Sequence, residues 1–231
     1  MSTPVETLGE APKREPAINA PWTVAALIIA LIGAHGLRVI SGGAPETFAL
    51  TSTDLVSERF AGLVTYQFVH GGWTHVLMNA AFILAFGAPV ARYLGGGWRG
   101  ATAFFCFFLV CGAVAAAVYG GYADLTGGLW GQRGGWVLLG ASGSASGLMG
   151  AAARLLEGRG RPGSMFGRTA ATMTLSWIAV NVLLGATGLT PGAAGAPVAW
   201  EAHIFGYFCG LLLIGPIGRV AGLKNDHAIA L

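Results

Sequence analysis

Charged residues are scarce in this chain. Asp, Glu, Lys and Arg make up 10% of its 231 residues, whereas a soluble domain carries about 25%. Hydrophobic residues make up 54%, and the mean hydropathy is +0.65. This shortage of charge excludes an ordinary soluble protein, and a net charge of only +3 gives no support for a nucleic-acid partner. The composition instead predicts a protein that crosses a membrane several times.

Cysteine is also scarce, and metal-binding motifs are lacking. The three cysteines have no CxxC spacing and lie in apolar segments, where we expect them to be small buried residues. No HExxH zinc signature occurs. The sequence therefore predicts no disulfide, no metal site and no cofactor. The cysteines are Cys106, Cys111 and Cys209.

A removable leader is not indicated. The first 20 residues contain three prolines and mixed charges, without a basic start, a short apolar core and a small-residue cleavage site. We expect a disordered cytoplasmic tail (1–20), a membrane domain of six helices (21–222) and a second cytoplasmic tail (223–231).

Long apolar segments are what the chain has in abundance. A membrane-spanning helix needs about 20 mainly apolar residues, and six segments qualify. The fold class predicted is an all-α polytopic membrane protein, a bundle of six transmembrane helices. The segments are Trp22–Ile40, His75–Tyr93, Arg99–Gly120, Trp136–Leu156, Thr169–Gly188 and Trp200–Val220.

The basic residues predict the orientation in the membrane. If the N-terminus is cytoplasmic, ten of the 13 Lys and Arg residues fall on the inner side, as the positive-inside rule requires. Both termini are then cytoplasmic, in what we expect to be a bacterial cytoplasmic (inner) membrane, with basic loops beside anionic lipid. The three basic residues on the outer side are Arg38, Arg59 and Arg133.

Four polar residues lie inside these apolar segments: His75, Asn79, Ser142 and His203. Polar groups at membrane depth are costly and by default functional. The second, fourth and sixth segments all run from outside to inside, so the starts of all three lie toward the outer face. We expect the four side chains to share that side and depth.

Their chemistry is that of a hydrolase. Asn79 follows His75 by four residues, so both lie on one helix face and can donate hydrogen bonds to a developing oxyanion. A serine hydroxyl needs an adjacent base, and His203 is the candidate. Each piece alone has another interpretation: GxSG is a weak signal in a glycine-rich chain, a lone histidine is often structural, and HxxxN can join two helices.

Three motifs resemble those of the rhomboid intramembrane serine proteases: HGGWTHVLMNAAF (70–82), GASGSASGLMGA (140–151) and AHIFGYFCG (202–210). The resemblance covers roughly residues 60 to 220, in order and spacing. It implies a serine–histidine dyad, without an acidic third member, that cleaves transmembrane segments of membrane-protein substrates.

The resemblance also implies a role for each residue. Ser142 would be the nucleophile, and His203 the general base and then general acid. His75, Asn79 and the backbone N–H of Ser142 would stabilise the oxyanion. A substrate would enter past the fifth span, with the Thr190–Val198 loop as a movable cap. Water would arrive through a polar depression lined by residues such as Ser144 and Ser146.

Glycines predict how the fourth and sixth spans meet. Gly143 and Gly147 share the GxxxG spacing, and so do Gly206 and Gly210. Small residues at this spacing let helix backbones approach closely. We expect these glycines to bring Ser142 and His203 within reach.

The chain departs from the family pattern. Ser146 stands where many members have an aromatic residue stacked on the catalytic histidine, and a serine cannot stack in this way. Because Ser146 lies one helical turn from Ser142, it is also a rival nucleophile. Ala61-Gly62 replaces the Trp-Arg pair of the first outer loop. Two other functions stay open: a non-catalytic rhomboid-like protein that binds membrane clients, and a haem protein that uses His75 and His203. The oligomeric state is left open.

Other titratable residues are expected to be structural or solvated. Glu201 lies two residues from His203 and so on another helix face, and Asp124 is expected on an outer loop. His70 is expected to stabilise a loop, and His35 is expected to be buried or to lie at the membrane interface.

Overall fold

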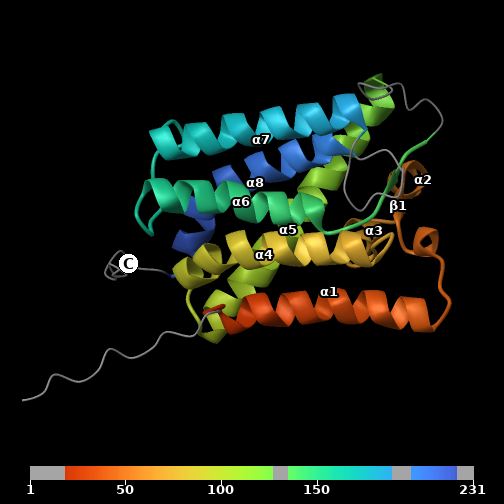
Figure 1. Ribbon diagram of the computed structural model, residues 1–231, viewed down its shortest axis with the longest axis horizontal. Coiled ribbons are helices and arrows are strands. Elements are labelled where there is room, and N and C mark those ends of the chain that lie inside the picture. Colours follow the sequence, from red (N-terminus) through yellow and green to blue (C-terminus); the bar gives the residue numbers. More distant parts are fainter. Residues whose placement is uncertain (1–18, 127–134, 189–198, 223–231) are drawn as a thin grey trace, which may run out of the picture.

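The structure, a computed structural model, describes residues 19–126, 135–188 and 199–222, and six long helices dominate it (Figure 1). The predicted tails, 1–20 and 223–231, lie almost wholly outside the described residues, and so does the predicted cap at Thr190–Val198. The long helices are α1 (Trp22–Ile40), α4 (Trp73–Leu94), α5 (Trp98–Thr126), α6 (Ser142–Glu157), α7 (Arg168–Thr187) and α8 (Trp200–Val220).

Short elements cover one end of the bundle, on the right in Figure 1. Two two-residue strands pair antiparallel there, with Leu50 opposite Leu138. The elements are η1 (Pro45–Thr47), β1 (Leu50–Thr51), α2 (Ser52–Val56), α3 (Gly62–Thr65), η2 (Tyr66–Phe68) and β2 (Val137–Leu138).

Most of the long helices have the length and the apolar surface of membrane-spanning helices. Among the described residues, five of them (α1, α4, α5, α7 and α8) are long and apolar enough to cross a membrane. Large apolar side chains point outward along them, where a soluble protein would place polar ones. The predicted all-α polytopic membrane fold is confirmed. Examples of exposed residues are Ile29, Leu37, Leu77, Leu175, Leu183 and Leu212.

The predicted fourth span, Trp136–Leu156, is wrong at its start. Helix α6 begins at Ser142 and has 16 residues. Before it the chain forms β2 and then turns at Gly140, whose φ of +105° favours glycine. A helix of this length is about 24 Å long, shorter than the roughly 30 Å hydrocarbon core of a bilayer. We therefore expect Ser142 to lie below the membrane surface.

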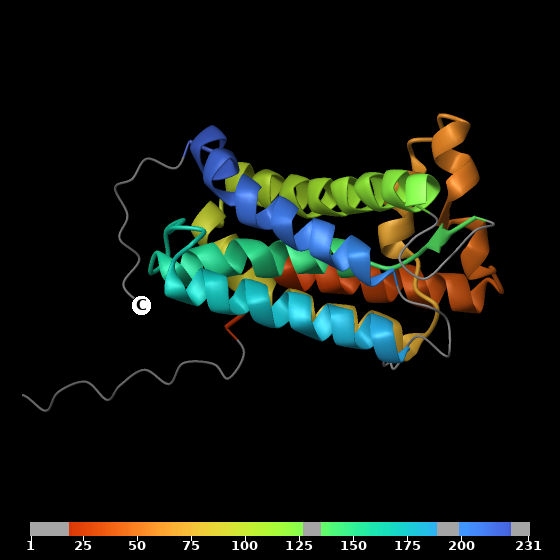
Figure 2. The same cartoon turned by 90° about the horizontal axis from the view of Figure 1, so that it is seen from above.

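Helix α6 occupies the centre of the bundle. It contacts α4, α5, α7 and α8, and Figures 1 and 2 show it enclosed among them. Eleven of its residues are buried, most of them Gly, Ala or Ser. Helix α7, at the edge opposite α1, buries only Ala170 and Asn181. The helix that begins with Ser142 is thus the most enclosed of the six, and α7 is the least.

Glycines bring α6 and α8 into backbone contact. A Cβ added at Gly206 would overlap the carbonyl oxygen of Gly143, and one added at Gly210 would overlap that of Gly147. Because these are main-chain atoms, a side chain cannot rotate out of the way. The close crossing depends on the absence of side chains at these positions.

Substitution of Gly210 tests this crossing. We expect Gly210→Ala to lower the free energy of unfolding by about 1–3 kcal/mol, the usual cost of overpacking a core, and to separate α6 from α8. Thermal denaturation in detergent micelles measures the effect. Gly121→Ala in α5 is the matched control, because its added Cβ has nothing within 4 Å. If both variants melt at the wild-type temperature, the crossing does not depend on Gly210.

Candidate active site

Ser142 and His203 form a hydrogen-bonded pair. The Oγ of Ser142 lies 2.9 Å from the Nε2 of His203, although 61 residues separate them in the chain. Ser142 is the first residue of α6, and His203 lies in the first turn of α8. Both side chains are partly exposed. The glycine-mediated crossing of α6 and α8 therefore places a hydroxyl against an imidazole.

His75 and Asn79 lie beside the chain that leads into Ser142. A Cβ added at Gly140 would lie 2.6 Å from Nε2 of His75 and 3.7 Å from Nδ2 of Asn79. Asn79 is buried, and its Nδ2 donates a hydrogen bond to the carbonyl of His75 at 3.2 Å. An amide nitrogen carries two hydrogens, so one N–H of Asn79 remains to donate elsewhere.

Asn181 on α7 contacts the other ring nitrogen of His203. Its Oδ1 lies 2.8 Å from Nδ1 of His203, and its side chain is fully buried. Sequence reasoning missed this residue. The signal was present, because a lone asparagine inside an apolar span is costly and by default functional.

The turn before Ser142 is anchored by the segment around η2. The backbone N–H of Gly140 donates to the carbonyl of Tyr66 at 3.0 Å. The Tyr66 hydroxyl donates to the carbonyl of Gly112 on α5 at 2.9 Å, and Ser144 Oγ donates to Oε1 of Gln67 at 2.7 Å. These bonds hold the start of α6 to α5 and to the segment before α4.

Comparison with known families decides the relationship. The rhomboid domain matches residues 57–219 of the chain. The chain belongs to the rhomboid family. A comparison with curated proteins gives no match. The matched range contains Ser142, His203, His75, Asn79 and Asn181, so all the groups described above belong to the rhomboid domain.

Ser146 is used within its own helix in this rhomboid. Its hydroxyl donates to the carbonyl of Ser142 at 2.7 Å, and the side chain is buried. Ser144 is buried too, so these serines do not line a polar depression open to water, and that expectation is wrong. An aromatic ring nevertheless lies near the histidine: Trp177 on α7, with ring centroids 6.3 Å apart and planes tilted by 34°.

Three histidines lie in a row beside the site. The ring of His70 is 5.1 Å from that of His75 and 6.3 Å from that of His35, between centroids. Arg38 donates to the carbonyl of His70 at 2.9 Å. His70 is fully buried. Burial, followed by the neighbouring His75, lowers the pKa of His70 to about 3, so a neutral ring packs behind His75.

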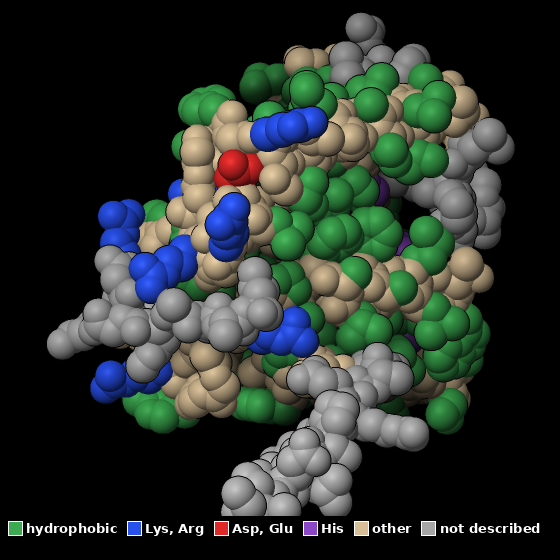
Figure 3. Space-filling view, turned by 60° about the vertical axis from the view of Figure 1, so that its left-hand side comes forward, with side chains coloured by type: hydrophobic (Ala, Val, Ile, Leu, Met, Phe, Trp, Pro, Cys, Tyr) green, Lys and Arg blue, Asp and Glu red, His purple; other side chains and the backbone are tan. Residues whose placement is uncertain are grey.

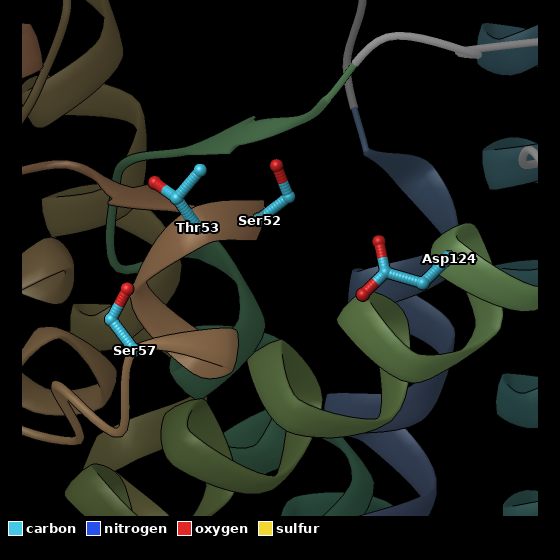
Figure 4. Close-up of a pocket in the computed structure, with 4 residues that line it drawn as sticks. All are labelled: Ser52, Thr53, Ser57 and Asp124. Atoms are coloured by element: carbon cyan, nitrogen blue, oxygen red, sulfur yellow. The ribbon is translucent and has the colours of Figure 1, made fainter.

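Asp124 lies away from His203, at the end of α5 rather than in a loop. Its Oδ1 accepts a hydrogen bond from Nε1 of Trp136 at 2.9 Å. Figure 4 shows its carboxylate facing Ser52, Thr53 and Ser57 across a hollow of about 250 Å³. Neither Ser142 nor His203 lines this hollow.

The site offers little to a metal or a haem. Within residues 19–126, 135–188 and 199–222, no group of three or more His, Cys, Asp and Glu side chains could hold a metal ion. Both ring nitrogens of His203 have hydrogen-bond partners, Ser142 and Asn181. An axial haem ligand needs one of these nitrogens free, so the arrangement disfavours the haem interpretation.

Proposed function

We propose that this rhomboid is an intramembrane serine endopeptidase that cleaves transmembrane segments of membrane proteins through a Ser142–His203 dyad and an acyl-enzyme. The observation that carries the proposal is the 2.9 Å bond between Ser142 Oγ and His203 Nε2. A serine becomes a nucleophile when a base within hydrogen-bond reach accepts its proton.

Acylation begins with attack by Oγ of Ser142 on the carbonyl carbon of the scissile peptide bond. The hydroxyl proton moves to Nε2 of His203, and a tetrahedral oxyanion forms. The oxyanion accepts hydrogen bonds from His75, from the free N–H of Asn79 and from the backbone N–H of Ser142. The first N–H groups of a helix have no intrahelical partner and carry partial positive charge. The C–N bond then breaks, and His203 returns its proton to the leaving amine.

Deacylation uses the same groups with water in place of the hydroxyl. His203 takes a proton from a water molecule, the resulting hydroxide attacks the ester carbonyl, and a second oxyanion forms. The C–O bond breaks, and the proton returns to Ser142. The acid fragment leaves, and the dyad is restored.

The arginines support an orientation with both termini cytoplasmic and the dyad toward the outer face. Arg92, Arg154 and Arg219 lie in the last turns of α4, α6 and α8. Ser142 and His203 lie in the first turns of α6 and α8. Figure 3 shows basic side chains gathered at one end beside a face of hydrophobic ones. Because the positive-inside rule favours basic residues on the cytoplasmic side, we propose that this end faces the cytoplasm across a bacterial inner membrane.

Helix α7 supports lateral access for a substrate. It buries only two residues, and its link to α4 includes a single aromatic contact, Phe82 with Trp177, at 5.6 Å between ring centroids. A transmembrane substrate would approach the dyad from the bilayer between α4 and α7.

Labelling with a fluorophosphonate probe in detergent micelles tests the proposal. We expect the probe to modify the wild type and Ser146→Ala at similar rates, and not to modify Ser142→Ala. Ser146 is the matched control, because it lies one turn along the same helix with its hydroxyl bound to a carbonyl. Loss of labelling only in Ser146→Ala would reassign the nucleophile.

The alternative, a non-catalytic protein that binds membrane clients, predicts a different outcome. The wild type would not be labelled, and Ser142→Ala would keep its full biological activity. The hydrogen-bonded dyad favours the enzyme, because client binding does not require a serine paired with a base.

A further inference from the structure

We infer that Asn181 is a positioning residue for this reaction: it holds His203 in the tautomer that can accept the proton of Ser142. The inference rests on the proposed function. It extends the dyad to a Ser142–His203–Asn181 chain of hydrogen bonds, with the third member supplied by α7 rather than by an acidic side chain.

The burial of Asn181 is the first observation. Helix α7 presents most of its surface outward, and Asn181 is the polar residue among the two that it buries. A buried amide costs free energy unless its hydrogen bonds are made. Both ends of this amide have a partner: Oδ1 with His203 Nδ1 at 2.8 Å, and Nδ2 with the carbonyl of Trp177 at 2.9 Å.

These two bonds fix the direction of the amide. The Trp177 carbonyl can only accept, so the group facing it must be the Nδ2 donor. Oδ1 therefore faces His203, and since a carbonyl oxygen can only accept, Nδ1 of His203 must carry the hydrogen. The opposite amide orientation would place two acceptors against each other and leave both oxygens without a donor.

The tautomer determines what Nε2 can do. With the hydrogen on Nδ1, Nε2 has a lone pair and accepts the hydrogen bond from Ser142 Oγ at 2.9 Å. With the hydrogen on Nε2, the ring could only donate to the serine, and it could not act as its base. The bond from Nδ1 to Asn181 thus decides whether Nε2 can act as the base for Ser142.

An asparagine suits this position better than an aspartate. An ionised carboxylate inside an outward-facing membrane helix is expensive, whereas a neutral amide accepts the same Nδ1–H bond without a buried charge. When His203 becomes an imidazolium during acylation, its Nδ1–H bond to Oδ1 shortens and strengthens, because one partner is now charged. Asn181 keeps the ring in place through both protonation states.

Among residues 19–126, 135–188 and 199–222, Asn181 Oδ1 is the hydrogen-bond acceptor that Nδ1 of His203 has. His75 on α4 is the titratable side chain that interacts electrostatically with it. Glu201 on the same helix acts electrostatically on Tyr119 of α5. Trp177 packs its ring near the imidazole but has no acceptor for Nδ1–H.

The test compares Asn181→Leu and Asn181→Ala with a matched control on the same helix. Thr174 joins α7 to α8 through a 3.0 Å bond to the Tyr207 hydroxyl, so Thr174→Val removes a polar contact between the same two helices without touching His203. We expect both Asn181 variants to lose about 10–100-fold in kcat and in the rate of fluorophosphonate labelling, by analogy with the loss when a group that orients a metal-binding histidine is removed. KM should stay near the wild-type value, and Thr174→Val should keep its rate.

Nitrogen-15 NMR of histidine-labelled protein gives a readout independent of activity. We expect the wild-type His203 signals, assigned by their absence in His203→Ala, to show the hydrogen on Nδ1, and those of Asn181→Leu to show both tautomers. A wild-type ring with its hydrogen on Nε2 would overturn the inference without any variant of Asn181. So would Asn181 variants that are labelled at the wild-type rate. Failure of the wild type to be labelled at Ser142 would instead reject the proposed function.

Discussion

Replacing His203 with alanine is expected to lower kcat for cleavage of a transmembrane substrate by at least about 10⁴-fold. Without the imidazole, Ser142 loses the base that accepts its proton, since His203 Nε2, at 2.9 Å, is the hydrogen-bond partner of Ser142 Oγ among the described residues. Losses of this size are usual when a serine hydrolase loses its base. Cleavage of a purified substrate in proteoliposomes, followed by gel analysis, measures the change.

The double variant Ser142→Ala/His203→Ala is the control for this result. Groups that act as one unit are not additive, so the double variant should be no less active than either single one. Thermal melting of all three variants checks that the fold is kept. Cleavage by His203→Ala at a tenth of the wild-type rate would show that another group is the base.

Removing either predicted oxyanion donor is expected to lower kcat by about 10²–10³-fold, the usual cost of one such hydrogen bond. The variants are Asn79→Ala and His75→Ala, whose side chains lie next to the turn at Gly140. Because the donors act on the transition state more than on the bound substrate, KM should change little. Steady-state cleavage in proteoliposomes separates the two constants.

Leu77→Ala is the matched control for this pair. Leu77 lies between the two donors on the same turn of α4, but its side chain is 52% exposed, whereas Asn79 is buried. We expect this variant to cleave at the wild-type rate. If Asn79→Ala instead raises KM and leaves kcat unchanged, the amide binds the substrate and does not stabilise the oxyanion.

Hydropathy predicted several helices closely. The first and sixth spans, Trp22–Ile40 and Trp200–Val220, have the bounds of α1 and α8, because both segments are continuous apolar runs with tryptophan at the start and polar or small residues beyond. The second and fifth differ from α4 and α7 by at most two residues at either end.

The fourth span could not be placed by hydropathy. The apolar residues of β2, Val137 and Leu138, look the same to a hydropathy count whether they continue a helix or pair with a strand. Their partner, Leu50–Thr51, lies more than eighty residues earlier in the chain. Such long-range pairing has no local signature, so the start of α6 at Ser142 is a result of the structure.

The candidate site was predictable only where a motif marks it. Ser142, His203, His75 and Asn79 stand in recognisable spacings, and the shared direction of their three spans brings them to one side of the membrane. Asn181 has no motif, and its partner lies 22 residues away on another helix. Which face of α7 points inward depends on how that helix packs, and its outward-facing apolar residues do not reveal it.

The contact between α6 and α8 has a mechanical consequence. Because the two helices meet through main-chain atoms at Gly143, Gly147, Gly206 and Gly210, no change of side-chain rotamer can open a space between them. The pair behaves as one stiff unit that carries the nucleophile and its base at a constant separation. Motion that admits a substrate must then come from the loosely held α7, and such motion would carry Asn181 with it. Opening the bundle and orienting the base would thus be opposing demands on a single helix.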